Sequence, residues 1–481
     1  MSESKKQMYL ETESVGKLIR KYSIPCILSL LVGALYNIVD QLFISNASYL
    51  GSYGNAANSV VFPLTVVALA AAVMIGDGAC AYVSICLGKK KAEQAGTTIG
   101  NAIGLTITVS LLLTFFYFVC MTPLLNFFGA SVNAKTFELA KEYFTYIAMG
   151  IPAYMFGQAM NPIIRSTGAP KFAMISNIIG AVLNIILDPI MIYPMHMGMM
   201  GAAVATVIGQ AVTAVLSVIY LMRMKTIALH QKDFHWSASL QKEFLPLGMT
   251  SLLSQISVVA SMAAVNTMIV RTGAVDSIFS QAQYAQIPMA VLGIVMKFFQ
   301  IIISISVGLA AGCIPLVAYN TGAGRYDRIK QFFIHLIIAE AFAGLAGLII
   351  AEFFPRAIMT LFGSANESVY YQEFAVNAFR IYLCMLVPAC INKGMFIFLQ
   401  SLGKAWTSTM LSLLREIVFG VGITLLLPIW FGLNGVLYSM PVSDLLALVF
   451  TIVVILKTVQ ELNTQMKTMA PVSLVLSQEA E

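Results

Sequence analysis

Apolar runs separated by short polar breaks recur along almost the whole chain. Because a helix needs about 20 apolar residues to cross the hydrocarbon core of a bilayer, each run predicts a transmembrane helix. The breaks fall at clusters of glycine, proline, asparagine and charged residues. The pattern predicts twelve spans, at residues 18–44, 56–83, 96–120, 138–160, 171–193, 201–222, 243–270, 280–310, 330–352, 372–399, 406–428 and 434–457.

Composition supports an all-α membrane protein and excludes a large soluble one. The chain is 59% hydrophobic and only 10% charged, whereas soluble domains carry about 25% charged residues. The net charge of +6 is modest, and no basic run is interleaved with aromatic residues. We therefore expect the lipid bilayer as a partner and no nucleic acid. Four scattered histidines and the lack of a CxxC pair predict no cofactor.

The distribution of lysine and arginine predicts the orientation. In the tails and loops of the predicted topology, 20 of the 28 basic residues fall on one side, including Arg165 in the loop before the span at 171–193, and at most four on the other. Cytoplasmic loops carry the excess of Lys and Arg, so a multi-pass protein of the cytoplasmic membrane with both termini in the cytoplasm is expected. The remaining four bases lie inside spans: Lys297, Arg380, Lys393 and Arg415.

The two halves of the chain resemble each other at a nearly constant offset of 234 in the numbering. Gly78 and Gly88 match Gly312 and Gly322, and other glycine and proline positions follow the same offset. Each half holds six spans, so the two bundles should be related by an axis along the membrane normal, as in some secondary transporters. The predicted parts are an N-terminal tail (1–17), an N-lobe (18–222), a linker (223–242), a C-lobe (243–457) and a cytoplasmic tail (458–481).

Acidic residues inside the spans are few, and two of them stand out. Asp40 shares one helical face with Asn37, and Asp188 shares one with Asn184. Buried acids are costly in a membrane and tend to face a cavity. Two carboxylates with neighbouring amide oxygens suit Na⁺ or a shared proton. The alternative is a hydrogen bond that only joins two helices.

Other polar and soft side chains are candidates for a substrate cavity. Methionine surfaces adapt to many ligands, although most of the 27 methionines are expected to pack or to face lipid. Asp77 has no assigned role, and Lys297 could pair with an acid across the cavity or extend toward the membrane surface. Glu340, Glu352, Glu416 and Asp444 are expected near span ends or beside a base, and Arg415 beside Glu416 is expected to anchor its helix. Since the second half has no counterparts of Asp40 and Asp188, ion coupling is expected in the first half. The substrate-binding candidates are Tyr36, Asn37, Met155, Gln158, Met289 and Lys297.

Several motifs resemble those of the multidrug and toxic compound extrusion (MATE) family of cation-coupled exporters. They lie at residues 25–43, 164–168, 184–189 and 201–206, and at residues 315–323 between the spans predicted at 280–310 and 330–352. The resemblance implies two six-helix lobes in a V shape and antiport driven by H⁺ or Na⁺. It also implies a cation or proton site in the N-lobe formed by Asp40, Asn184, Asp188 and Thr206.

The resulting hypothesis is a monomeric antiporter, not an enzyme, that exports organic, cationic and amphipathic molecules. The rival transport function is a flippase for lipid-linked saccharides or lipids, which would need a cationic cavity built from the bases inside the spans. An intramembrane aspartyl protease is disfavoured because Met74 stands where the Gly-x-Gly-Asp pattern around Asp77 requires its first glycine.

Overall fold

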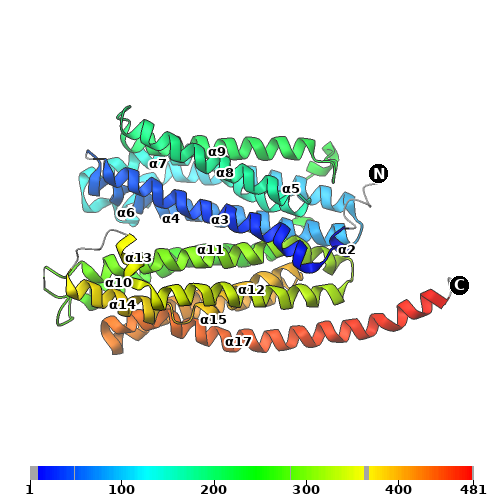
Figure 1. Ribbon diagram of the computed structural model, residues 1–481. Helices are drawn as coiled ribbons and strands as arrows, with labels where there is room; N and C mark the ends of the chain where they lie inside the picture. Colours follow the sequence, from blue (N-terminus) through cyan, green and yellow to red (C-terminus); the bar gives the residue numbers. More distant parts are fainter. Residues whose placement is uncertain (1–8, 48, 282, 362–367, 479–481) are drawn as a thin grey trace.

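In the computed structural model, which describes residues 9–47, 49–281, 283–361 and 368–478, the chain folds into helices, and no strand occurs within these ranges. The N-lobe helices form one bundle in Figure 1. Asn133 begins α7 by accepting a hydrogen bond from the backbone N–H of Lys135 at 2.8 Å, and Pro170 opens α8. The long helices of this lobe are α3 (Val15–Asn46), α4 (Gly51–Gly88), α5 (Ala92–Val119), α7 (Ala134–Ser166), α8 (Pro170–Ile192) and α9 (Gly198–Arg223).

The C-lobe forms the second bundle, drawn in yellow-green to red in Figure 1. One of its spans is broken, because α14 and α15 meet at a bend of 42°. A kink at Gly432, where φ is 56°, separates two spans within α17. Its helices are α10 (Ala238–Gly273), α11 (Ile287–Gly322), α12 (Tyr326–Phe353), α14 (Val369–Tyr382), α15 (Leu386–Ser401), α16 (Ala405–Leu413), the π-helix η3 (Leu414–Val421) and α17 (Gly422–Gln478). The short helices are α2 (Tyr9–Thr12), α6 (Met121–Phe127), η1 (Ala130–Val132), η2 (Gln231–Phe234) and α13 (Pro355–Leu361).

The structure reproduces the internal repeat in its backbone. Helices α12 and α13 begin and end at the positions that the offset of 234 assigns to the ends of α5 and α6. Gly198 and Gly432, which are related by the same offset, both have left-handed backbones, with φ of 61° and 56°. Only glycine adopts this conformation at little cost. The repeat is therefore a repeat of fold as well as of sequence.

The lobes pack closely near the end of the molecule where both termini lie (Figure 1). There α4 and α11, which correspond in the repeat, cross with their backbones almost in contact. A Cβ atom on Gly88 would lie 2.0 Å from the carbonyl oxygen of Tyr319, and one on Gly322 would lie 2.1 Å from that of Ile85. Such contact needs glycine on both helices. Gly88 and its repeat partner Gly322 therefore allow the close contact between the lobes, which we call the seal.

Twelve spans can be assigned to the described residues. Nine helices pass a length and hydropathy test for membrane spans, and the bent pair α14–α15 makes ten. The kink at Gly432 divides the segment 405–468 into two spans, and the more polar helix α7 completes the set.

One predicted span is misplaced. The eighth span was expected at 280–310, but α11 begins at Ile287 and continues to Gly322. The motif at 315–323 therefore ends a helix instead of forming a loop. Pro315 lies within this helix, where neighbouring small residues such as Gly312 allow close packing against α3.

Candidate functional site

Two acidic side chains from different helices meet inside the N-lobe. Asp40 comes from α3 and Asp188 from α8, and their exposed fractions are 6% and 0%. The two carboxylates interact directly with each other. Neither has a Lys, Arg or His nitrogen within ion-pair distance in the described part of the chain. Two buried acids thus face each other without a base.

Asn184 and Thr206 extend this pair. Asn184 lies one helical turn before Asp188, and its side-chain amide donates to Asp188 Oδ1 at 3.2 Å and to Thr206 Oγ1 at 3.1 Å. The hydroxyl of Thr206 brings α9 into the same cluster. The four residues expected to form a cation or proton site therefore lie together.

The cluster contains oxygen atoms that lack a hydrogen-bond donor. Among the described residues, Asp40 Oδ1, Asn184 Oδ1 and Asp188 Oδ2 are buried and unpaired. Buried polar atoms are rarely left in this state, because each one costs free energy unless a partner satisfies it. Carboxylate and amide oxygens are the ligands that hard cations prefer, and a proton shared by two carboxylates removes their repulsion. The residues present therefore fit either Na⁺ or H⁺.

A cavity of about 260 Å³ adjoins this cluster. Asn184 and Thr206 belong to its wall, together with the predicted substrate residues Tyr36, Asn37 and Gln158. The other three candidates lie outside the wall: Met155 is fully buried, Met289 is 43% exposed, and Lys297 is half-buried without a polar partner among the described residues. The cavity therefore gathers only half of the side chains proposed to bind substrate.

The cavity wall is rich in amides that the sequence did not single out. They come from both lobes, and among the described residues the wall includes no Asp, Glu, Lys or Arg. The only available sequence signal was a polar side chain on an otherwise apolar helix. The missed amides are Gln210, Gln255 and Gln300.

An ion pair of the N-lobe lies at its interface with the C-lobe. Arg165 was expected in a cytoplasmic loop, but it is buried in the last turn of α7 and forms an ion pair with Asp77 of α4 at 3.5 Å. It also contacts the thiol of Cys26. Asp77 accepts a hydrogen bond of 2.8 Å from Ser251 of α10, which belongs to the other lobe. Asp77 therefore joins the two lobes.

A family model described as MatE matches residues 25–190 and 250–426, which is more than half of the chain. The chain belongs to the MatE family. Its curated relatives include the multidrug export protein MepA of Staphylococcus haemolyticus (strain JCSC1435), 24% identical over 437 residues that cover 91% of this chain and 92% of that protein. MepA of Staphylococcus aureus (strain MSSA476) is 23% identical over the same coverage.

Solved structures agree with the MatE assignment. The MATE multidrug transporter DinF-BH, solved with a bound compound, is 31% identical and superimposes with a TM-score of 0.83 over 93% of this chain and 96% of that one. A MATE in complex with MaD3S gives a TM-score of 0.85 at 23% identity, over 96% and 99% of the two chains. The expected fold of two six-helix bundles in a V shape is confirmed. The protein is therefore a multi-pass membrane transporter.

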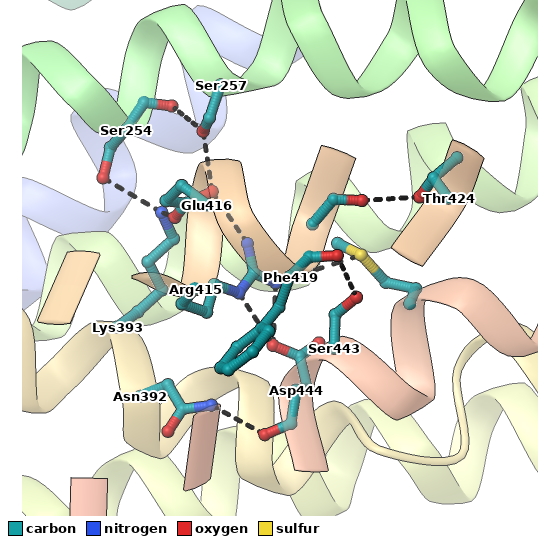
Figure 2. A network of polar contacts seen from close by, with 12 residues as sticks. Ser254, Ser257, Asn392, Lys393, Arg415, Glu416, Phe419, Thr424, Ser443 and Asp444 are labelled. Carbon is teal, nitrogen blue, oxygen red and sulfur yellow. Dashed lines mark hydrogen bonds and ion pairs between the residues drawn. The ribbon is translucent and has the colours of Figure 1, made fainter. Parts of the chain in front are cut away.

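The C-lobe of this MatE protein contains a buried cluster of four charges, which Figure 2 shows. Arg415 donates from Nε to Asp444 Oδ1 at 2.8 Å and from Nη1 to Glu416 Oε2 at 2.8 Å, and its Nη2 lies 2.8 Å from Asp444 Oδ1 as an ion pair. Lys393 forms an ion pair with the other oxygen of Glu416. All four side chains are at most 6% exposed. We call Lys393, Arg415, Glu416 and Asp444 the C-lobe charge cluster.

The structure agrees with part of one sequence-based interpretation. Glu416 and Asp444, expected near span ends or beside a base, do lie beside Arg415, whereas Glu340 lies within α12 and has no ion pair among the described residues. All three are almost completely buried. Arg415 and Glu416 lie in the π-helix η3, where the wider turn lets two consecutive side chains enter one cluster. Glu340 accepts a hydrogen bond of 2.5 Å from Ser306. The second lobe thus buries at least as many acidic side chains as the first.

Proposed function

We propose that this protein exports organic, cationic and amphipathic molecules across the bacterial cytoplasmic membrane in exchange for H⁺ or Na⁺. The observation that carries the proposal is the set of unpaired oxygens of Asp40, Asn184 and Asp188 beside the cavity. These oxygens have no protein donor among the described residues, so a proton or a cation from solution would complete the site. Thr206 orients Asn184 within it.

The cavity supports a substrate with one positive charge and a large apolar body. Among described residues its wall is uncharged, so the neighbouring acid pair is the nearest source of negative charge. A small cation and a cationic substrate would then compete for the same carboxylates. The relatives point the same way, since MepA is described as a multidrug export protein and DinF-BH as a multidrug transporter.

The seal between the lobes indicates which side of the transporter is closed in this conformation. The glycine contacts and the Asp77–Ser251 hydrogen bond lie toward the end that contains both termini. Arg165 is buried in α7 and no longer counts as a loop residue. The remaining basic residues of the loops and tails still favour placing this end in the cytoplasm. In the conformation described, the coupling ion would then enter from outside. Exchange requires the substrate and the ion to prefer different states of the transporter.

A monomer can supply every part of this mechanism. The four site residues and the cavity wall all come from one chain. The rival flippase function needs a cationic cavity, yet Lys393 and Arg415 are paired with acids, and Arg380 lies 3.4 Å from Glu352. These pairs favour the drug exporter over the flippase.

Ethidium transport into inverted membrane vesicles tests the proposal. A lumen with high Na⁺ or with low pH supplies the two gradients separately, and vesicles without the protein give the background. We expect one gradient to drive ethidium uptake at least fivefold above this background. Uptake at background level under both gradients would overturn the proposed coupling and favour the flippase.

A further inference from the structure

The ammonium group of Lys393 has oxygen ligands of the kind a small cation would have. It contacts Glu416 Oε1 and donates to Ser254 Oγ at 3.0 Å. The other carboxylate oxygen of Glu416 accepts from Ser257 at 2.6 Å and from Arg415 at 2.8 Å. Figure 2 shows these groups converging from α10, α15 and η3. Lys393 therefore places a positive charge among carboxylate and hydroxyl oxygens.

The repeat places this cluster at the C-lobe counterpart of the N-lobe cavity wall. At an offset of 234 or 235 in the numbering, α16, η3 and α17 correspond to α8 and α9, and Asp444 corresponds to Gln210 in the cavity wall. For the first helix of each lobe the offset is 221. Gly248 packs against Met74, and Ile27 packs against Gly308, which is the repeat partner of Met74. By the offset of 221, Ser257 corresponds to Tyr36, which also belongs to the cavity wall, so helices that line the cavity in one lobe build the charge cluster in the other.

The C-lobe charge cluster balances its own charge, whereas the N-lobe acid pair does not. The C-lobe charge cluster has two carboxylates and two bases, so its formal charge is zero. Without Lys393, Arg415 alone would balance Glu416 and Asp444, and one negative charge would remain buried. Such a charge is costly unless a counter-ion fills the space.

We infer that the Lys393 ammonium is a tethered cation that fills a latent site for a monovalent cation, formed by Glu416 and Ser254. Shortening this side chain opens the site to Na⁺ or to a small primary ammonium ion. The wild-type C-lobe therefore takes no ion from solution, and the exchangeable site lies in the N-lobe. The inference concerns binding to the C-lobe and does not depend on the proposed transport function.

Thermal unfolding of the purified full-length protein in detergent tests this inference. The parent is Asp40→Asn/Asp188→Asn, in which the N-lobe site is neutral, and Lys393→Ala is added to it. Each protein is heated in NaCl, methylammonium chloride or choline chloride at equal ionic strength. We expect Na⁺ or methylammonium to raise the Tm of the Lys393→Ala protein by on the order of 3 °C, saturably, relative to choline. The parent should show no such difference.

Two further variants control the experiment. Lys297→Ala in the same parent removes a lysine without a polar partner among the described residues and should not create a cation response. Lys393→Ala/Glu416→Gln restores charge balance, so it should fold and should lose the response. Equal Tm values for Lys393→Ala in all three salts would overturn the inference. If Lys393→Ala is unstable in choline, recovery in methylammonium supports the inference, whereas loss of folding in all three salts contradicts it.

Discussion

In the N-lobe, Asp40 and Asp188 face each other without a base, whereas in the C-lobe Glu416 and Asp444 share Arg415 and Lys393. Helices that correspond in the repeat carry both arrangements. A cluster that balances its own charge needs nothing from solution and can act as a fixed joint between helices. An unbalanced acid pair must take a proton or a cation to be buried at low cost. Charge balance thus separates a structural core in the C-lobe from the coupling site proposed in the N-lobe, on one repeated scaffold.

Asp40→Asn should have the largest effect on transport. It removes one of the two carboxylates, so gradient-driven ethidium uptake in inverted vesicles should fall to background. The Tm in detergent should stay the same or rise, because a repulsive pair of acids is relieved. Glu138→Gln, which changes an exposed acid in the same lobe, is the matched control and should keep full uptake. Persistent uptake by Asp40→Asn would remove the N-lobe pair from the mechanism.

Glu416→Gln should have the largest effect on stability. It leaves Lys393 buried without its carboxylate, and breaking a buried ion pair in this way costs about 3–5 kcal/mol. We expect a clear loss of Tm, measured in detergent, even in choline chloride. Adding Lys393→Met restores charge balance and should recover most of the loss. A Glu416→Gln protein as stable as Asp40→Asn would mean that the two clusters do not differ as their charges indicate.

The sequence predicted most of the scaffold, because a span is defined by local hydrophobicity. It also brought Asp40, Asn184 and Asp188 together, since helical spacing and an apolar background made them conspicuous. The eighth span was misplaced because Pro315 and nearby glycines resemble a loop, although a buried helix accommodates them. The sequence pattern therefore predicts well those features that depend on the residues of a single helix.

The missed features depend on contacts between distant helices. Lys393 lies on α15 and Glu416 on η3, and only the packing of these separate helices shows that the two side chains pair. Arg165 resembles a loop residue because a turn follows it at Gly168, yet Asp77 holds it inside the protein. The cavity amides were overlooked because an isolated glutamine on an apolar helix gives no indication of which side chains it faces.

Asp77→Asn should have an intermediate effect, which tests the contact that Asp77 makes between the two lobes. The amide can still accept the hydrogen bond from Ser251, but Arg165 loses its ion-pair partner. We expect a destabilisation of about 1.5–3 kcal/mol. We also expect cysteines introduced near the glycine contacts between α4 and α11 to react faster with a membrane-impermeant thiol reagent. Ser251→Ala should increase the reactivity less, since Arg165 keeps its carboxylate. Unchanged reactivity in both variants would restrict Asp77 to a role within the N-lobe.

Replacing one buried threonine in each lobe gives the smallest effects and the closest test of the contrast. Thr206 accepts from Asn184 in the N-lobe, while Thr424 donates to the carbonyl of Gly420 at 2.6 Å near the C-lobe charge cluster (Figure 2). Each Thr→Val change removes one hydrogen bond, worth about 1 kcal/mol. In Thr206→Val, Asn184 loses the hydrogen bond that orients it, so the proposed site should bind the coupling cation more weakly. Half-maximal uptake should then require about fivefold more coupling cation. In Thr424→Val, the lost hydrogen bond should lower only the stability of the folded protein. The cation dependence of uptake should match wild type, while the Tm drops slightly. Equal shifts in cation dependence would show that both lobes contribute to coupling despite their different charge balance.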